Sequence, residues 1–224
     1  MALLNTKPDY NVNYDYTDIA AGTGIQRYYA ASLSGANFTT SQNILTDQVI
    51  RGGQTCYVKY YDPAGTGWES LPAVNFDLYF NLPRIIKGNA VVNITTGCNA
   101  YTDGGNQETK ATIVLQKYDG TTATDIISGV TSIQKNDNIP AQAYASRQHS
   151  VIMAVPKTKF KRGEYLRMSV RQEVKNNSGD PMYWGFGIDP YNTADVGNDP
   201  TGRRLIFASE ATILTLDLPF QTGY

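Results

Sequence analysis

Short runs of β-branched and aromatic residues recur along this chain, and clusters of Gly, Pro, Asn and Asp separate them. Runs of this length and composition are typical of β-strands. The runs are IQRYYAASL (25–33), TCYVKYY (55–61), VNFDLYFNL (74–82), AVVNITT (90–96), ATIVLQKY (111–118), ATDIISGV (123–130), SVIMAVP (150–156), EYLRMSV (164–170), MYWGFGI (182–188) and RLIFASEATILTLDLPF (204–220). Because no helical segments alternate with them, they predict an all-β fold and not a βαβ fold.

Several runs alternate between two chemically different faces, as a half-buried strand does. In residues 165–171 one face is apolar and consists of Leu166, Met168 and Val170. The opposite face carries Tyr165, Arg167 and Arg171. The apolar face is predicted to enter the core, and the other face to meet water, a ligand or another protein.

The number of runs predicts an antiparallel β-sandwich, jelly-roll-like, because such folds often form a single domain of about 200–250 residues. We predict an extended N-terminal arm over residues 1–24 and one sandwich domain over residues 25–224. The arm is polar and has no sustained period, and the alternative is an ordered first strand of the same domain. The strongest helical candidate is a short turn in PAQAYASRQ (140–148).

Composition and charge favour protein partners. The formal net charge is −1 and only 17% of the residues are charged, which argues against a dedicated nucleic-acid surface or a membrane-binding basic face. The 16 tyrosines are typical of a surface that other molecules cover. The N-terminus lacks the pattern of a secretory signal, so synthesis in the cytoplasm is expected, with Cys56 and Cys98 as reduced thiols.

No catalytic, cofactor or metal residue stands out in the sequence. His149 is the only histidine, and Ser146 and Ser150 lie near it, but no nucleophile motif surrounds them. We therefore predict that the chain is not an enzyme and carries no cofactor. The loop Asp189–Asp199 is rich in oxygen ligands, and both calcium binding and ordinary Asx-turns remain open for it.

The candidate assembly contacts combine tyrosine with arginine. Both residue types are enriched where one protein buries the surface of another, because each has a broad apolar body and a directional polar end. The candidates are Tyr10, Tyr14 and Tyr16 in the arm, and Tyr165, Arg167 and Arg171 on the predicted strand. A solvated face is the alternative for the two arginines.

Five separated stretches together resemble a family of β-sandwich virion proteins of tailed bacteriophages. They are DYTDIAAGTGIQRYYAAS (15–32), FDLYFNLPRIIKGNAVVNI (76–94), PKTKFKRGEYLRMSV (156–170), the IDP turn (188–190) and LTLDLPFQ (214–221). They occur in the family's order and are spread over the chain from residue 15 to residue 221. The family pattern would place a tyrosine or similar residue where this chain has Asp217.

The resemblance implies a structural component of the virion, made in the host cytoplasm. We expect a capsid decoration or cement protein that binds copies of itself and neighbouring virion proteins. The alternatives are a head-to-tail or tail-associated component, and a peripheral carbohydrate-binding receptor module that uses aromatic residues such as Trp68 and Trp184. A glycan-cleaving enzyme is a third hypothesis.

Overall fold

The structure, a computed structural model, describes residues 23–33, 42–50, 56–61, 67–100, 105–139, 144–177, 182–188 and 214–221. The strands are β1 (Thr23–Leu33), β2 (Gln42–Thr46), β3 (Cys56–Tyr61), β4 (Trp68–Ser70), β5 (Val74–Tyr79), β6 (Arg84–Ala100), β7 (Gly105–Tyr118), β8 (Ala123–Val130), β9 (Gln134–Ile139), β10 (Tyr144–Phe160), β11 (Tyr165–Asn176), β12 (Met182–Gly187) and β13 (Thr215–Gln221). In this part of the chain the regular structure is entirely β, which confirms the predicted class.

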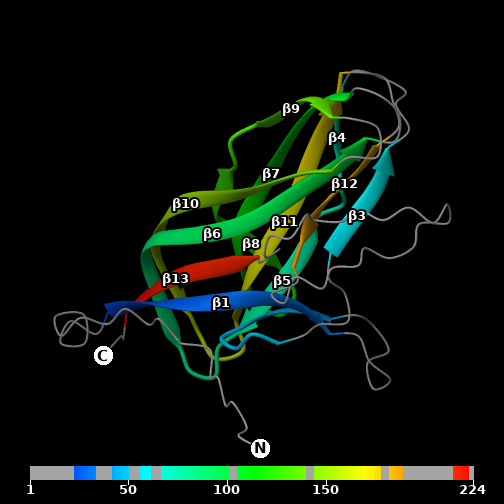
Figure 1. The fold of residues 1–224 in the computed structure, drawn as a ribbon. Coiled ribbons are helices and arrows are strands. Elements are labelled where there is room, and N and C mark those ends of the chain that lie inside the picture. Colours follow the sequence, from blue (N-terminus) through cyan, green and yellow to red (C-terminus); the bar gives the residue numbers. More distant parts are fainter. Residues whose placement is uncertain are drawn as a thin grey trace, which may run out of the picture.

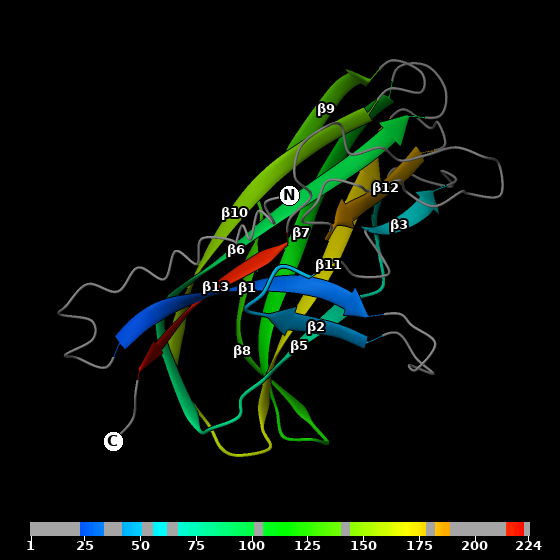
Figure 2. The same ribbon diagram turned by 60° about the horizontal axis from the view of Figure 1, so that its bottom comes forward.

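The strands form two facing layers (Figures 1 and 2). In the first layer β10 pairs with one edge of β6, and β12 and β13 each pair with part of the other edge. Beyond these, β3 pairs with β12, β1 pairs with β13, and β2 pairs with β1. The second layer has the order β5, β11, β7, β8, with β4 beside β11 and β9 beside β7. All pairings are antiparallel except one parallel bridge, Ile44 to Asp77, that joins the layers. The predicted antiparallel sandwich is therefore confirmed.

The core lies between the two layers and consists of the apolar side chains that occupy every second position along the strands. Leu166, Met168 and Val170 of β11 are fully buried, as their spacing predicts. The opposite layer contributes Trp184 and Phe186 of β12, which are also fully buried. Burying a side chain of this size stabilises the folded state by about 1.5–3 kcal/mol. Packing between the layers therefore holds the sandwich together.

One predicted element is wrong. Residues 144–148 of the expected helical turn belong to β10, while residues 140–143 lie outside the described residues. Tyr144 to Gln148 pair in register with Asn99 to Thr95 of β6. The ladder of hydrogen bonds to β6 overrides the weak local helical preference of Ala, Gln and Arg, as tertiary context commonly does.

The start of β1 lies close to the predicted end of the arm. Thr23 and Gly24 already pair with Gln221 and Phe220 of β13, so the first strand begins two residues earlier than predicted. Tyr10, Tyr14 and Tyr16 lie outside the described residues. The division into arm and domain stays a prediction.

Gly129 of β8 lies at the close contact between β8 and β10. A Cβ atom on Gly129 of β8 would come within 2.5 Å of Val151 Cγ1 and 2.9 Å of Met153 Cγ, both on β10. A larger side chain fits there only if Val151 and Met153 shift. Gly129 therefore allows β8 and β10 to pack closely at this edge.

We predict that Gly129→Ala lowers the free energy of unfolding by about 1–3 kcal/mol, the usual range for overpacking a core. Denaturant unfolding of the purified chain measures the effect. Gly67→Ala is the matched control, because a Cβ on Gly67 meets nothing within 4 Å. Equal stability of the two variants would show that β8 and β10 do not pack this closely.

Candidate functional site

Three tyrosines lie side by side on the outer face of the second layer. Tyr165 of β11 is in register with Tyr79 of β5 on one side and with Tyr118 of β7 on the other. The ring centroids are 4.7 Å apart for Tyr79 and Tyr165, and 4.8 Å apart for Tyr118 and Tyr165. We call these residues the tyrosine row. Tyr79 is 63% exposed, so the row presents aromatic surface to whatever approaches this face.

Arg167 locks the row in place from the neighbouring position on β11. Its Nε and Nη2 atoms donate to the two carboxylate oxygens of Asp77, at 2.7 and 2.9 Å, and Nη2 also donates to the Tyr165 hydroxyl at 3.2 Å. The guanidinium carbon lies 4.4 Å from the Tyr118 ring centroid. The hydrogen bonds to Asp77 raise the pKa of Arg167. The guanidinium therefore stays protonated, and the Asp77 carboxylate balances its charge.

The structure therefore brings together two of the predicted contact residues, Tyr165 and Arg167. Arg171 lies further along β11, exposed and opposite Thr112, and is not part of the row. The sequence reading missed Tyr79, Tyr118 and Asp77. Their signal is the alternation in VNFDLYF and in the run ending at Tyr118, but only the cross-strand register places them beside Tyr165.

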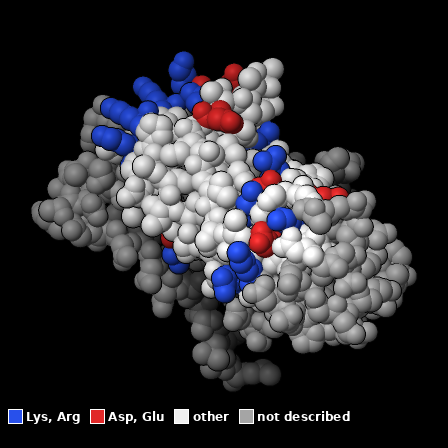
Figure 3. All heavy atoms as spheres, turned by 90° about the horizontal axis from the view of Figure 1, so that it is seen from above, with Lys and Arg blue, Asp and Glu red and all other residues white. Residues whose placement is uncertain are grey.

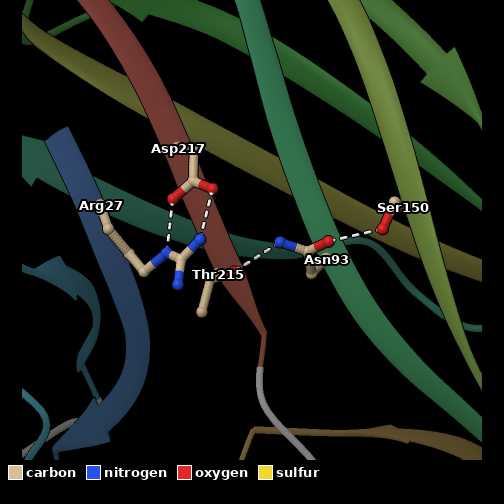
Figure 4. Close-up of polar contacts among 5 residues, drawn as sticks. All are labelled: Arg27, Asn93, Ser150, Thr215 and Asp217. Carbon is tan, nitrogen blue, oxygen red and sulfur yellow. Dashed lines mark hydrogen bonds and ion pairs between the residues drawn. The ribbon is translucent and has the colours of Figure 1, made fainter. Parts of the chain in front are cut away.

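A second polar surface lies on the outer face of the first layer (Figure 4). Thr215 of β13, Asn93 of β6 and Ser150 of β10 are in register, and Asn93 links them. Ser150 Oγ donates to Asn93 Oδ1 at 2.6 Å, and Asn93 Nδ2 donates to Thr215 Oγ1 at 3.1 Å. Arg27 Nε and Nη2 donate to both carboxylate oxygens of Asp217, two residues along β13 from Thr215, at 2.6 and 2.8 Å.

A groove of about 260 Å³ lies over these residues. Its polar lining includes Arg27, Tyr29, Asn93, Gln148, Ser150 and Thr215. The hydrogen bonds to Asp217 raise the pKa of Arg27, while its partial burial acts in the opposite direction. Asp217 thus serves as the partner of Arg27.

His149 and Ser150 point to opposite sides of β10. His149 is buried, and its Nε2 atom lies 3.2 Å from Thr96 Oγ1. Burial lowers the pKa of His149, and nearby Arg147 lowers it further. Ser150 Oγ instead bonds Asn93 on the outer face. Adjacent strand residues face opposite ways, so the two side chains are not brought together.

The other residues considered as sugar-binding, thiol or metal sites lie in different parts of the chain. Trp184 is fully buried, so its ring is not accessible for stacking on a sugar, whereas Trp68 is 36% exposed and holds Lys110 Nζ 4.3 Å from its ring centroid. Cys98 is buried. The Asp189–Asp199 loop lies outside the described residues, and within the part that the structure describes no three His, Cys, Asp or Glu side chains gather.

Basic side chains collect near the end of β10. Lys157, Lys159, Lys161 and Arg162 are all exposed, as is Lys87 on β6. Glu164, the acidic residue next to this segment, is occupied by Lys117 Nζ at 2.7 Å and by the backbone N–H of Lys161. Figure 3 shows Lys and Arg side chains gathered along one margin of the molecule, beside a large uncharged area.

No helix in the described residues meets the length and hydropathy needed to cross a membrane.

Comparison with known proteins gives no family. No family model matches the chain, and no curated protein matches it. Among solved structures, it is similar to a CocE/NonD family hydrolase from Staphylococcus aureus, with 12% identity and a TM-score of 0.44 over 90% of this chain and 37% of that one. It is also similar to an alpha-amino acid ester hydrolase, with 11% identity and a TM-score of 0.49 over 88% of this chain and 36% of that one. The chain thus spans little more than a third of each hydrolase.

A third similar structure is that of infectious bursal disease virus, Gx strain, with 12% identity and a TM-score of 0.29 over 87% of this chain and 42% of that one. These findings correct one prediction. The exclusion of an enzyme made from the sequence is wrong as an exclusion, because hydrolases stand among the similar solved structures. At these identities and scores no activity is carried from any of them to this chain.

The packing of the tyrosine row predicts an unusual titration. Burial, followed by the nearby Asp77 carboxylate, raises the pKa of the Tyr165 hydroxyl to about 12. A tyrosine of an unfolded chain ionises near pH ~10. The folded state therefore holds this proton more tightly, and the resulting stabilisation is complete below pH ~10 and is lost as the pH rises towards 12.

Carbon-13 NMR of tyrosine-labelled protein measures this pKa directly, with Tyr165→Phe assigning the resonance. We also expect the stability of the wild type to fall more steeply above pH ~10 than that of Tyr165→Phe, because the variant lacks the shifted group. A Tyr165 resonance that titrates with the ordinary value would contradict the described packing.

Proposed function

We propose that this chain is a structural protein of a tailed-phage particle, where it decorates the capsid and binds copies of itself and neighbouring virion proteins. The ordered sequence stretches that resemble the phage virion family support the proposal. The observation that carries it is the tyrosine row, a half-exposed aromatic surface held by the Arg167–Asp77 pair. Tyrosine and arginine are the residues most enriched at the energetic centres of protein interfaces.

The tyrosine row suits protein contact because its side chains are already ordered. Arg167 is fixed by two oxygens of Asp77 and by the Tyr165 hydroxyl, so little rotamer freedom is lost when a partner covers the face. Biological contacts commonly bury more than about 1,000 Å², and repetition on a particle lattice makes individually weak contacts strong together.

The stoichiometry of the chain in purified particles tests the proposal. Quantitative mass spectrometry relative to the most abundant virion protein is expected to give hundreds of copies, as decoration of a symmetric shell requires. About a dozen copies would move the protein to a tail-associated ring, and a few copies would move it to fibres. Absence from the particle would overturn the proposal altogether.

The tyrosine row makes a prediction for the isolated protein. Tyr79→Ala should weaken self-association of the chain about tenfold or more, since removal of an interface tyrosine typically costs over 1 kcal/mol. Sedimentation velocity over a concentration series measures the effect. Ile152→Ala is the matched control, because Ile152 is 68% exposed and lies on the other layer. If both variants associate like the wild type, this face is not the contact.

A further inference from the structure

The groove over Asn93 takes no part in the proposed assembly contact. It lies on the outer face of the layer that contains β1, β13, β6 and β10, whereas the tyrosine row belongs to the layer of β5, β11 and β7. Three neighbouring strands supply a row of short polar side chains to its floor, in the order Thr215, Asn93, Ser150 (Figure 4). Short side chains on paired strands have little freedom, so this row is fixed before any ligand arrives.

The hydrogen bonds inside the row leave a defined set of groups for a ligand. Ser150 uses its hydroxyl proton on Asn93, so its oxygen can still accept. Asn93 uses one of its amide protons on Thr215 and keeps the other, whereas the Thr215 side chain is almost fully buried. Arg27 uses Nε and Nη2 on Asp217, and Tyr29 is a further hydrogen-bonding neighbour of its guanidinium. A donor of Asn93 and an acceptor of Ser150 therefore lie side by side.

Among the described residues that line the groove, no charge is left uncompensated. The bidentate contact with Asp217 neutralises Arg27, and the side chains on the outer face of the sheet that line the groove otherwise carry hydroxyls and amides. A charged ligand would find no free counter-charge here, so the lining favours a neutral ligand rich in hydroxyl groups.

The volume of the groove and its aromatic lining residue favour a ligand with a single sugar ring. A volume of about 260 Å³ lies below the range of about 300–1,000 Å³ typical of sites for drug-sized molecules. Tyr29 lines the groove beside Thr215, with which it is in register, and an aromatic ring suits the apolar face of a pyranose. We propose that the groove formed by Arg27, Tyr29, Asn93, Ser150 and Thr215 binds a single neutral sugar residue of a glycan. This site is independent of the assembly role and needs neither tryptophan.

Amide NMR of the full-length chain with neutral hexoses and N-acetylhexosamines at millimolar concentration tests the site. We expect shifts confined to residues near Asn93, Ser150 and Thr215, with at least one sugar producing saturable changes. Glycerol serves as a small polyol control and N-methylacetamide as a probe of the peptide group. No saturable shift with any sugar, or equal shifts with either control compound, would overturn the proposal.

Matched variants locate the binding. Asn93→Ala should weaken the responding sugar about tenfold, as expected for loss of a hydrogen-bonding group in a fixed site. Asn75→Ala is the control, because Asn75 is an exposed asparagine on the outer face of the other layer. Ser150→Ala provides a second probe at an exposed position should Asn93→Ala fail to fold. Unchanged affinity in Ser150→Ala and in a folded Asn93→Ala would remove the sugar from this groove.

Discussion

Strand β6 is the constraint on which the rest of the structure depends, because it must pair along both edges and bend within its length. β10 follows one edge from Asn99 to Arg84, and β12 and β13 divide the other edge between them. The bend falls at Gly88, whose φ of 122° is a conformation that side chains rarely adopt. Both neighbours shift register nearby, β10 between Val155 and Thr158 and β13 between Asp217 and Phe220.

The bend needs three residues that do not suit a straight strand. Gly88 supplies the backbone conformation, and a Cβ there would also approach the Pro219 ring to 3.3 Å. Pro156 and Pro219 lie inside the register shifts, where the pairing with β6 is already interrupted. Past the bend, Ile86 and Phe160 are fully buried, so the curved ends of β6 and β10 still contribute to the core. Curvature of this kind lets a sheet wrap around its own interior.

The alternation of apolar and polar residues along a strand explains how much of the fold could be predicted from the sequence. Strand β8 matches its predicted range, and the buried faces of β5 and β11 follow the predicted alternation. The lengths of β6 and β10 could not be read, because Gly88 and Pro156 look like breaks until paired strands turn them into a bend. Polar residues mislead in the same way: Gln172 and Asn176 continue the inward face of β11 and are buried, although their type predicts exposure.

Sites depend on register, which local pattern does not contain. Arg167 and Arg171 lie on the same face of one strand and look equivalent in the sequence, yet only Arg167 faces a carboxylate across the strand pair. The ordered arginine fixes two tyrosine rings beside it, whereas the exposed Arg171 would lose its own freedom on binding. The same reasoning separates Asn93, held between Ser150 and Thr215, from the exposed Asn75. Side chains that the fold has already ordered are the ones from which a binding surface gains most.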